Sequence, residues 1–145
     1  MDIVWGSILV IFTLILCWLA QIINAFFPEL AAKLGLNEAE DEVDPTFFAD
    51  TRGEAIWDAF TLWPLPVAGI LMLMSNPNWA YFGLVGGGIY LYFAGRGIVV
   101  RVLMENRGIR IGARDTVRAY YVFLSLWAVL AIITIILSVR ALPLQ

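Results

Sequence analysis

The sequence predicts an all-α integral membrane protein, a bundle of four transmembrane helices with a short interfacial helix before the second span. Hydrophobic residues make up 61% of the chain and charged residues 14%, against about 45–50% and about 25% in soluble domains. A soluble protein of 145 residues could not bury so much apolar surface. In addition, the stretches 3–27, 59–95 and 119–139 contain no charged residue.

These stretches predict four spans, because a helix needs about 20 mostly apolar residues to cross a bilayer. The middle stretch is too long for one span and contains the strong turn signal Ser75-Asn-Pro-Asn78. Backbone polar groups must be hydrogen-bonded within lipid, so the spans are expected to be helices. We expect a single membrane domain, 1–145, with spans at about 3–27, 57–74, 79–103 and 117–140, an acidic loop at 28–56 and a basic loop at 104–116.

The first span is expected to be retained, since no basic segment precedes it and its apolar run is longer than that of a signal peptide. Its small and polar residues recur at steps of three and four and so share one face. This stripe includes Thr13, Cys17, Gln21 and Asn24. Such residues either form hydrogen bonds with neighbouring helices or line a polar path.

Between the first two spans, Pro28 is expected to open a short helix that ends at Gly35. Asp44 and Pro45 then match the cap and the first residue of another helix. We expect this helix to lie along the membrane surface before the chain turns into span two. Within span two, Pro64 and Pro66 predict a kink or a local unwinding, because proline removes a helical hydrogen bond and crowds the preceding turn.

The third span contains six glycines between Gly83 and Gly97. No lysine lies in this stretch, which excludes a phosphate-binding loop of the GxxxxGK[ST] type. In lipid, glycines at helical spacing allow the backbone of another helix to approach closely. The predicted packing face comprises Gly83, Gly86, Gly87, Gly88 and Ala94.

Basic residues predict the orientation. Lys33 and Arg52 lie in the first loop, five arginines lie at 101–118, and Arg140 lies on the opposite side. Short loops rich in Lys and Arg stay in the cytoplasm. We therefore expect loops one and three to be cytoplasmic and both termini to lie outside an inner or plasma membrane. Because the first loop is acidic and the third is basic, the two loops either dock or stay separately solvated.

Two ionisable groups lie within the expected spans, Asp58 and Arg96, at a similar depth on the same side. They form a candidate buried ion pair, although each could also reach the headgroups separately. Asp50, Glu54 and Asp58 recur every four residues and form a candidate carboxylate cluster. Such a cluster could hold a divalent cation or carry a raised pKa, but the preferred interpretation is a face that is solvated or salt-bridged, with Arg52, Arg96 or Arg101 as possible partners.

The sequence contains one cysteine and no histidine. Internal disulfides, Cys/His zinc sites, histidine-ligated haem and histidine-based triads are therefore excluded. We expect no cofactor, no metal and no nucleic-acid partner. The middle of each span also lacks charge, which argues against proton- or ion-coupled transport.

Three functions are compatible with these features. We expect a non-enzymatic scaffold or accessory subunit whose partners are the lipid bilayer and other membrane helices or copies of itself. The alternative is a small oligomeric channel or facilitator for ions or small solutes, with the stripe of span one or the proline break lining the path. A third hypothesis is an intramembrane enzyme built on Asp50, Glu54 and Asp58.

Overall fold

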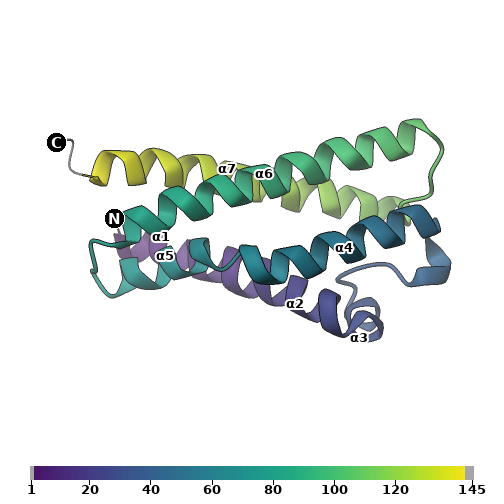
Figure 1. The fold of residues 1–145 in the computed structure, drawn as a ribbon, viewed down its shortest axis with the longest axis horizontal. Helices are drawn as coiled ribbons and strands as arrows, with labels where there is room; N and C mark the ends of the chain where they lie inside the picture. The colour runs from purple at the N-terminus through teal and green to yellow at the C-terminus, as the bar shows by residue number, and fades with distance from the viewer. Residues whose placement is uncertain (1, 143–145) are drawn as a thin grey trace.

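The computed structural model describes residues 2–142, and the chain in this range is built from helices without strands. Four helical segments are long and apolar enough to span a membrane: Asp2–Phe26, Pro45–Leu73, Trp79–Asn106 and Arg114–Ala141. These four rods lie side by side along the long axis (Figure 1). One end, here called the loop end, carries the connections 27–44 and 107–113. The other, the turn end, carries the turn between the second and third rods, the start of the first rod and the end of the fourth.

The first rod consists of α1 (Asp2–Leu9), η1 (Val10–Trp18) and α2 (Leu19–Phe26). Its middle part, η1, is a π-helix, in which the amide of Leu19 donates to the carbonyl of Leu14, five residues earlier. Thr13 and Cys17, four residues apart, are both buried in this segment. The sequence predicts the span but gives no sign of the wider turn, which is rare in proteins.

The connection to the second rod follows the predicted capping signals. Helix α3 (Pro28–Lys33) begins at Pro28, and Gly35 ends it with a φ of 68°. After the short 3₁₀ turn η2 (Glu40–Glu42), helix α4 (Pro45–Thr61) begins behind Asp44. The carboxylate of Asp44 accepts a hydrogen bond from the amide of Thr46 at 2.8 Å. This bond lowers the pKa of Asp44, because it stabilises the charged form.

The prediction of a separate interfacial helix before the second span is wrong. Residues 45–56 belong to α4, which runs along the bundle and leads into α5 (Pro64–Leu73) (Figure 1). The second rod therefore begins 12 residues before the expected start at residue 57. The physical reason is that side chains of α2 and α6 bond to the acidic face of α4, so this face can lie inside the bundle.

The second rod breaks where its prolines are. Helix α4 ends at Thr61 and α5 restarts at Pro64, whose missing amide cannot continue the helical ladder. Next to the break, the carbonyl of Ala59 accepts a hydrogen bond from the Trp18 indole at 2.9 Å. Prolines and a neighbouring rod together therefore produce a bend that is hydrogen-bonded within the bundle.

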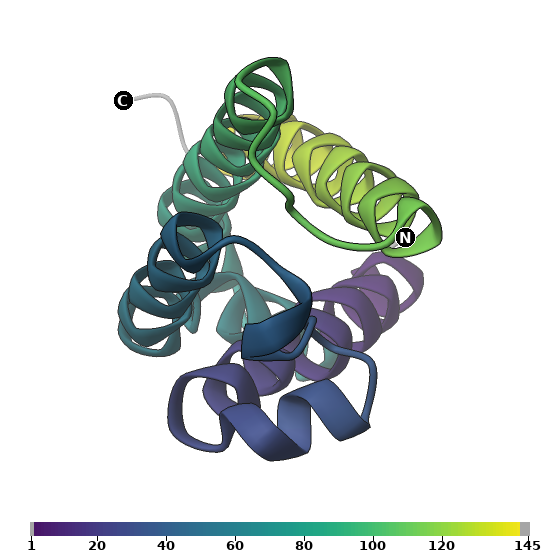
Figure 2. The ribbon, with the colours of Figure 1, turned by 90° about the vertical axis from the view of Figure 1, so that its right-hand side faces the viewer.

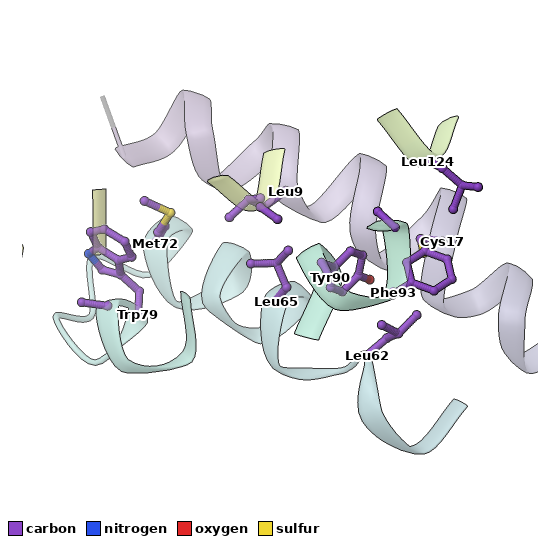
Figure 3. Packing of buried hydrophobic residues seen from close by; sticks show 12 residues of the cluster. Leu9, Cys17, Leu62, Leu65, Met72, Trp79, Tyr90, Phe93 and Leu124 are labelled. Carbon is purple, nitrogen blue, oxygen red and sulfur yellow. The ribbon is translucent and has the colours of Figure 1, made fainter. Parts of the chain in front are cut away.

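The centre of the bundle is apolar (Figure 3). Leu9, Leu65, Met72 and Tyr90 are almost completely buried there. The hydroxyl of Tyr90 donates to the backbone carbonyl of Thr13 at 2.9 Å, so the one polar atom of this ring is satisfied. The side chains come from the first, second and third rods and close the middle of the interior.

Helix α6 (Trp79–Asn106) uses its glycines against two different neighbours. A Cβ on Gly83 would overlap the Ser138 side chain of α7 (Arg114–Ala141), and a Cβ on Gly87 would lie 3.2 Å from the Ala131 carbonyl of the same helix. A Cβ on Gly86 would instead overlap the backbone of Leu65 in α5. These glycines thus allow close approach on two faces of α6.

Gly88 and Ala94 complete the predicted packing face and behave differently from each other. Ala94 is fully buried, whereas a Cβ on Gly88 would meet no atom within 4 Å. Gly88 therefore points away from the packed interior.

Two indole groups attach α7 to the first rod. Trp5 Nε1 donates to Thr134 Oγ1 at 3.1 Å, and Trp127 Nε1 donates to the Phe12 carbonyl at 2.9 Å. Otherwise α7 packs chiefly along α6 (Figure 2). These two bonds close the ring of four rods.

We predict that Gly86→Ala destabilises the protein by about 1–3 kcal/mol, the range for overpacking a well-packed site. The new methyl group would meet the Leu65 backbone, which cannot rotate away as a side chain can. The measurement is the thermal unfolding midpoint of the purified protein in detergent.

Gly88→Ala is the matched control, because it adds the same methyl group to the same helix in open space. It should leave the midpoint unchanged or raise it slightly, since alanine favours a helix over glycine by about 1 kcal/mol. Equal losses in the two variants would contradict this packing.

Candidate functional site

The acidic face of α4 lies inside the bundle near the loop end. Asp50, Glu54 and Asp58 follow one another at single-turn spacing, so their side chains project from one side of the helix. Asp58 is 5% exposed and the Glu54 side chain 7% exposed, which requires partners for both charges. These three carboxylates, with Gln21 of α2 and Arg96 and Arg101 of α6, are called the charge cluster below.

Arg96 bridges two of the carboxylates. Its Nη2 lies 2.6 Å from Asp50 Oδ1, and its Nη1 lies 2.9 Å from Glu54 Oε1. A guanidinium presents several N–H donors in a planar fork, which suits two acceptors one helical turn apart. Arg96 thereby fixes the third rod to the second.

The predicted Asp58–Arg96 ion pair is replaced by another arrangement. Asp58 Oδ2 accepts a hydrogen bond from Gln21 Nε2 at 2.7 Å, whereas Arg96 turns to Asp50 and Glu54. Asp58 and Arg96 were expected to pair because they lie at a similar depth. The expected neutralisation of the carboxylates by Arg96 is confirmed for Asp50 and Glu54, and the first rod supplies the amide that bonds to Asp58.

Arg101 lies deeper than expected for a loop residue and is 8% exposed. Its Nη1 donates to the Gly97 carbonyl at 3.1 Å and lies 3.8 Å from Glu54 Oε2. The guanidinium carbon stands 5.6 Å from the Phe47 ring centre and 5.0 Å from that of Tyr120. Both distances are within the range of cation–π attraction.

The stripe of the first rod faces the interior over its whole length. Thr13 donates to the Leu9 carbonyl at 2.7 Å, and Cys17 is buried with a free thiol. Gln21 joins the charge cluster, and Asn24 Oδ1 accepts from Asn37 Nδ2 at 3.3 Å. Most of its polar groups are thus engaged in bonds within the chain.

Arg52 does not act as the expected partner of the carboxylates. Its Nη1 donates to the backbone carbonyl of Asn24 at 2.8 Å, near the end of the first rod. In the part of the chain that the structure describes, no group of three carboxylate, cysteine or histidine side chains is arranged to hold a metal ion. The carboxylates of the charge cluster face arginine and amide donors.

A cavity of about 230 Å³ lies next to the charge cluster, between the first rod, α4, α6 and α7. Its polar wall includes Gln21, Asn24 and Arg101, and its apolar wall includes Leu16, Phe123 and Trp127. A separate groove runs between α4 and α6 on the outside of the bundle, lined among others by Gly53, Trp57, Gly88, Tyr92 and Arg96. The charge cluster separates the two hollows.

The two charged connections contact each other at the loop end. Asp44 N donates to the Arg110 carbonyl at 2.8 Å, and Arg110 Nη2 donates to the Asp41 carbonyl at 3.0 Å. The amide of Ala113 donates to Glu38 Oε1 at 2.9 Å. Under these bonds, Val43, Phe47 and Ile111 form a small apolar cluster. The loops therefore dock through apolar contacts and through hydrogen bonds that each involve a backbone group, instead of through ion pairs.

Sequence reasoning named Arg101 as a possible partner of the carboxylates, but it missed the burial of Arg101 and the role of Tyr120. Arg101 lies within the expected third span, two residues before its end at residue 103, and this depth is the signal that could have indicated its burial. Tyr120, which donates to Asn37 Oδ1 at 3.0 Å, carries no such signal, because its partner lies in a distant connection.

No protein-family model, no curated protein and no solved structure matches this chain.

We predict that Arg96→Gln lowers the free energy of unfolding by about 2 kcal/mol, because it leaves Asp50 and the buried Glu54 without their closest cation. Glu54→Gln in the same chain should recover part of the loss, since the orphaned charge is then removed. The measurement is a double-mutant cycle of unfolding in detergent, with an expected coupling of at least about 0.5 kcal/mol.

Arg107→Gln serves as the control. Arg107 is exposed in the connection between α6 and α7, so its replacement should change stability by no more than about 0.5 kcal/mol. A coupling of zero between positions 96 and 54 would contradict the charge cluster.

Proposed function

We propose that this chain is a multi-pass membrane protein that acts, without catalysing a reaction, as a scaffold or accessory subunit for other membrane helices. The four rods of membrane-spanning length and their apolar outer surfaces support the membrane location. The scaffold function is inferred chiefly from the groove between α4 and α6. This groove combines close backbone access with large exposed side chains.

Small residues form the floor of the groove. A Cβ on Gly53 or Gly88 would meet no atom within 4 Å, although both glycines lie in helices. Glycine is costly in a helix unless a neighbour needs the space. Gly83, Gly86 and Gly87 have such neighbours inside the chain, and Gly88 lacks one there. A helix from another protein or a second copy would supply that neighbour.

Large side chains flank this floor. Trp57 is 67% exposed and Tyr92 is 69% exposed, one on each helix of the groove. In lipid, helices associate through dispersion contacts and hydrogen bonds, since burial from water gives no advantage between them. Glycine backbone between two aromatic side chains offers both a close approach and a large contact area.

The loop end offers a second surface for a partner outside the lipid. Glu40, Asp41 and Arg107 are exposed there, and their charged groups make no hydrogen bond or ion pair among the described residues. These side chains are therefore available to a soluble partner, whereas Arg110 and Glu42 already bond to backbone groups of the connections. We place this end in the cytoplasm, as the distribution of arginine and lysine favours.

The alternative of a channel has less support. The stripe Thr13, Cys17, Gln21 and Asn24 turns inward and is largely engaged in bonds within the chain. In addition, the apolar side chains around Leu65 and Tyr90 occupy the middle of the interior. A path for ions would have to run between several copies of the chain.

The topology can be tested by labelling single cysteines. In a Cys17→Ala background, we expect Glu40→Cys and Arg107→Cys to react with a membrane-impermeant maleimide from the cytoplasmic side only. Asn76→Cys, in the turn between the second and third rods, should react from the opposite side only. Labelling of positions 40 and 107 from different sides would refute the four-span arrangement.

The scaffold function predicts a specific effect of filling the groove. Gly88→Trp should abolish co-purification of the tagged chain with its stoichiometric membrane partner, or with a second copy, from native membranes. Ile136→Trp is the matched control, because Ile136 is 46% exposed on α7, away from the groove. Both variants should keep the unfolding midpoint of the original chain.

The same preparation separates the scaffold from the channel. Purified protein in liposomes should conduct no ions and pass no small solutes, whatever its oligomeric state in detergent. Flux that disappears on Thr13→Leu would favour the channel, and unchanged co-purification of Gly88→Trp would exclude the groove as the docking site.

A further inference from the structure

The cavity beside the charge cluster has features of a binding site that the proposed scaffold function does not use. It lies between the first rod and α7, which are joined by the Trp127–Phe12 hydrogen bond. Toward the loop end, Tyr120 of α7 also donates to Asn37 in the connection 27–44. The volume is about 230 Å³. An apolar cavity of about 150 Å³ already accommodates benzene.

The polar wall of the cavity offers unused hydrogen-bond donors. The hydrogen bond and the ion contact of Arg101 use Nη1. Nε is buried without a partner and is closed to a bound molecule, whereas Nη2 makes no hydrogen bond among the residues that the structure describes. Tyr120 and Gln21 direct their own donors to Asn37 and Asp58. The Nη2 group of Arg101 is therefore one donor that is available to an acceptor on a bound molecule.

The charged residues that line the cavity indicate that the acceptor group of a bound molecule is uncharged. Arg101 and Glu54 are the charged residues that line the cavity, and their groups are 3.8 Å apart. Their formal charges cancel. An anionic headgroup would gain the guanidinium but would also approach the carboxylate of Glu54, whereas a carbonyl oxygen meets no such repulsion.

The aromatic and apolar residues of the cavity wall favour a ligand that has a ring and an apolar tail. Phe93, Phe123 and Trp127 line the cavity, and aromatic side chains pack favourably against other rings. Leu16 is 43% exposed and Phe123 is 39% exposed, although both also line the cavity. The cavity therefore opens sideways between η1 and α7, toward the lipid in the proposed membrane arrangement.

We propose that this cavity binds the head of an uncharged lipophilic ring compound with carbonyl acceptors, the chemistry of a membrane quinone. The ring lies between the aromatic side chains, a carbonyl oxygen accepts hydrogen bonds from Arg101, and the tail leaves between η1 and α7. The proposal concerns binding and involves no electron transfer.

The test uses the full chain in phosphatidylcholine nanodiscs and a decyl-substituted benzoquinone as the probe. Saturable quenching of tryptophan fluorescence is expected, because Trp127 lines the cavity. An azido derivative of the same quinone should cross-link to residues of η1, α2 or α7 that line the cavity. Arg101→Lys should weaken binding about tenfold, the effect of losing one good hydrogen bond.

A second variant keeps the proposal falsifiable if Arg101→Lys fails to fold. Ala20→Phe fills the cavity without touching an ion pair and should abolish saturable binding. Ile15→Phe places the same side chain on the 51% exposed side of η1 and should bind normally. Equal quenching in all variants, cross-links confined to lipid-facing residues, or displacement of the probe by phosphatidylglycerol would overturn the proposal.

Discussion

The structure depends on burying a row of carboxylates inside an apolar bundle. Glu54 and Asp58 are buried and need polar partners, Asp50 is partly exposed, and the partners of all three come from two other rods. Arg96 fixes α6 to α4, and Gln21 fixes the first rod to α4. Three of the four rods are thus held in register by directional bonds, and the acidic half of α4 can run along the bundle for that reason.

Close packing of the helices provides the contacts between rods that the bonds of the charge cluster do not provide. Between helices in lipid, contact has to come from dispersion and hydrogen bonds, which require that backbones approach one another. Gly83 and Gly87 allow this approach to α7, and Gly86 allows it to α5. The indoles of Trp5 and Trp127 then close the ring of rods with hydrogen bonds that apolar contacts could not replace.

The charge cluster also separates two hollows with different properties. On the outer side, the groove between α4 and α6 has a glycine floor and exposed aromatic side chains, which suits another helix. On the inner side, the cavity combines aromatic walls with the unused donors of Arg101, which suits a small lipophilic acceptor. Glu54 lines both hollows.

The sequence by itself determined the number and approximate positions of the four rods, the capped start at Asp44, the break before Pro64 and the close-packing role of Gly83, Gly86 and Gly87. These features follow from local composition, helical spacing and backbone chemistry. Only the tertiary structure decided the partners of Asp58 and Arg96, the burial of Arg101, the open side of Gly88 and the cavity. Each of these depends on how distant segments rotate against one another, and helical spacing places a residue on a face without saying which neighbour that face will meet.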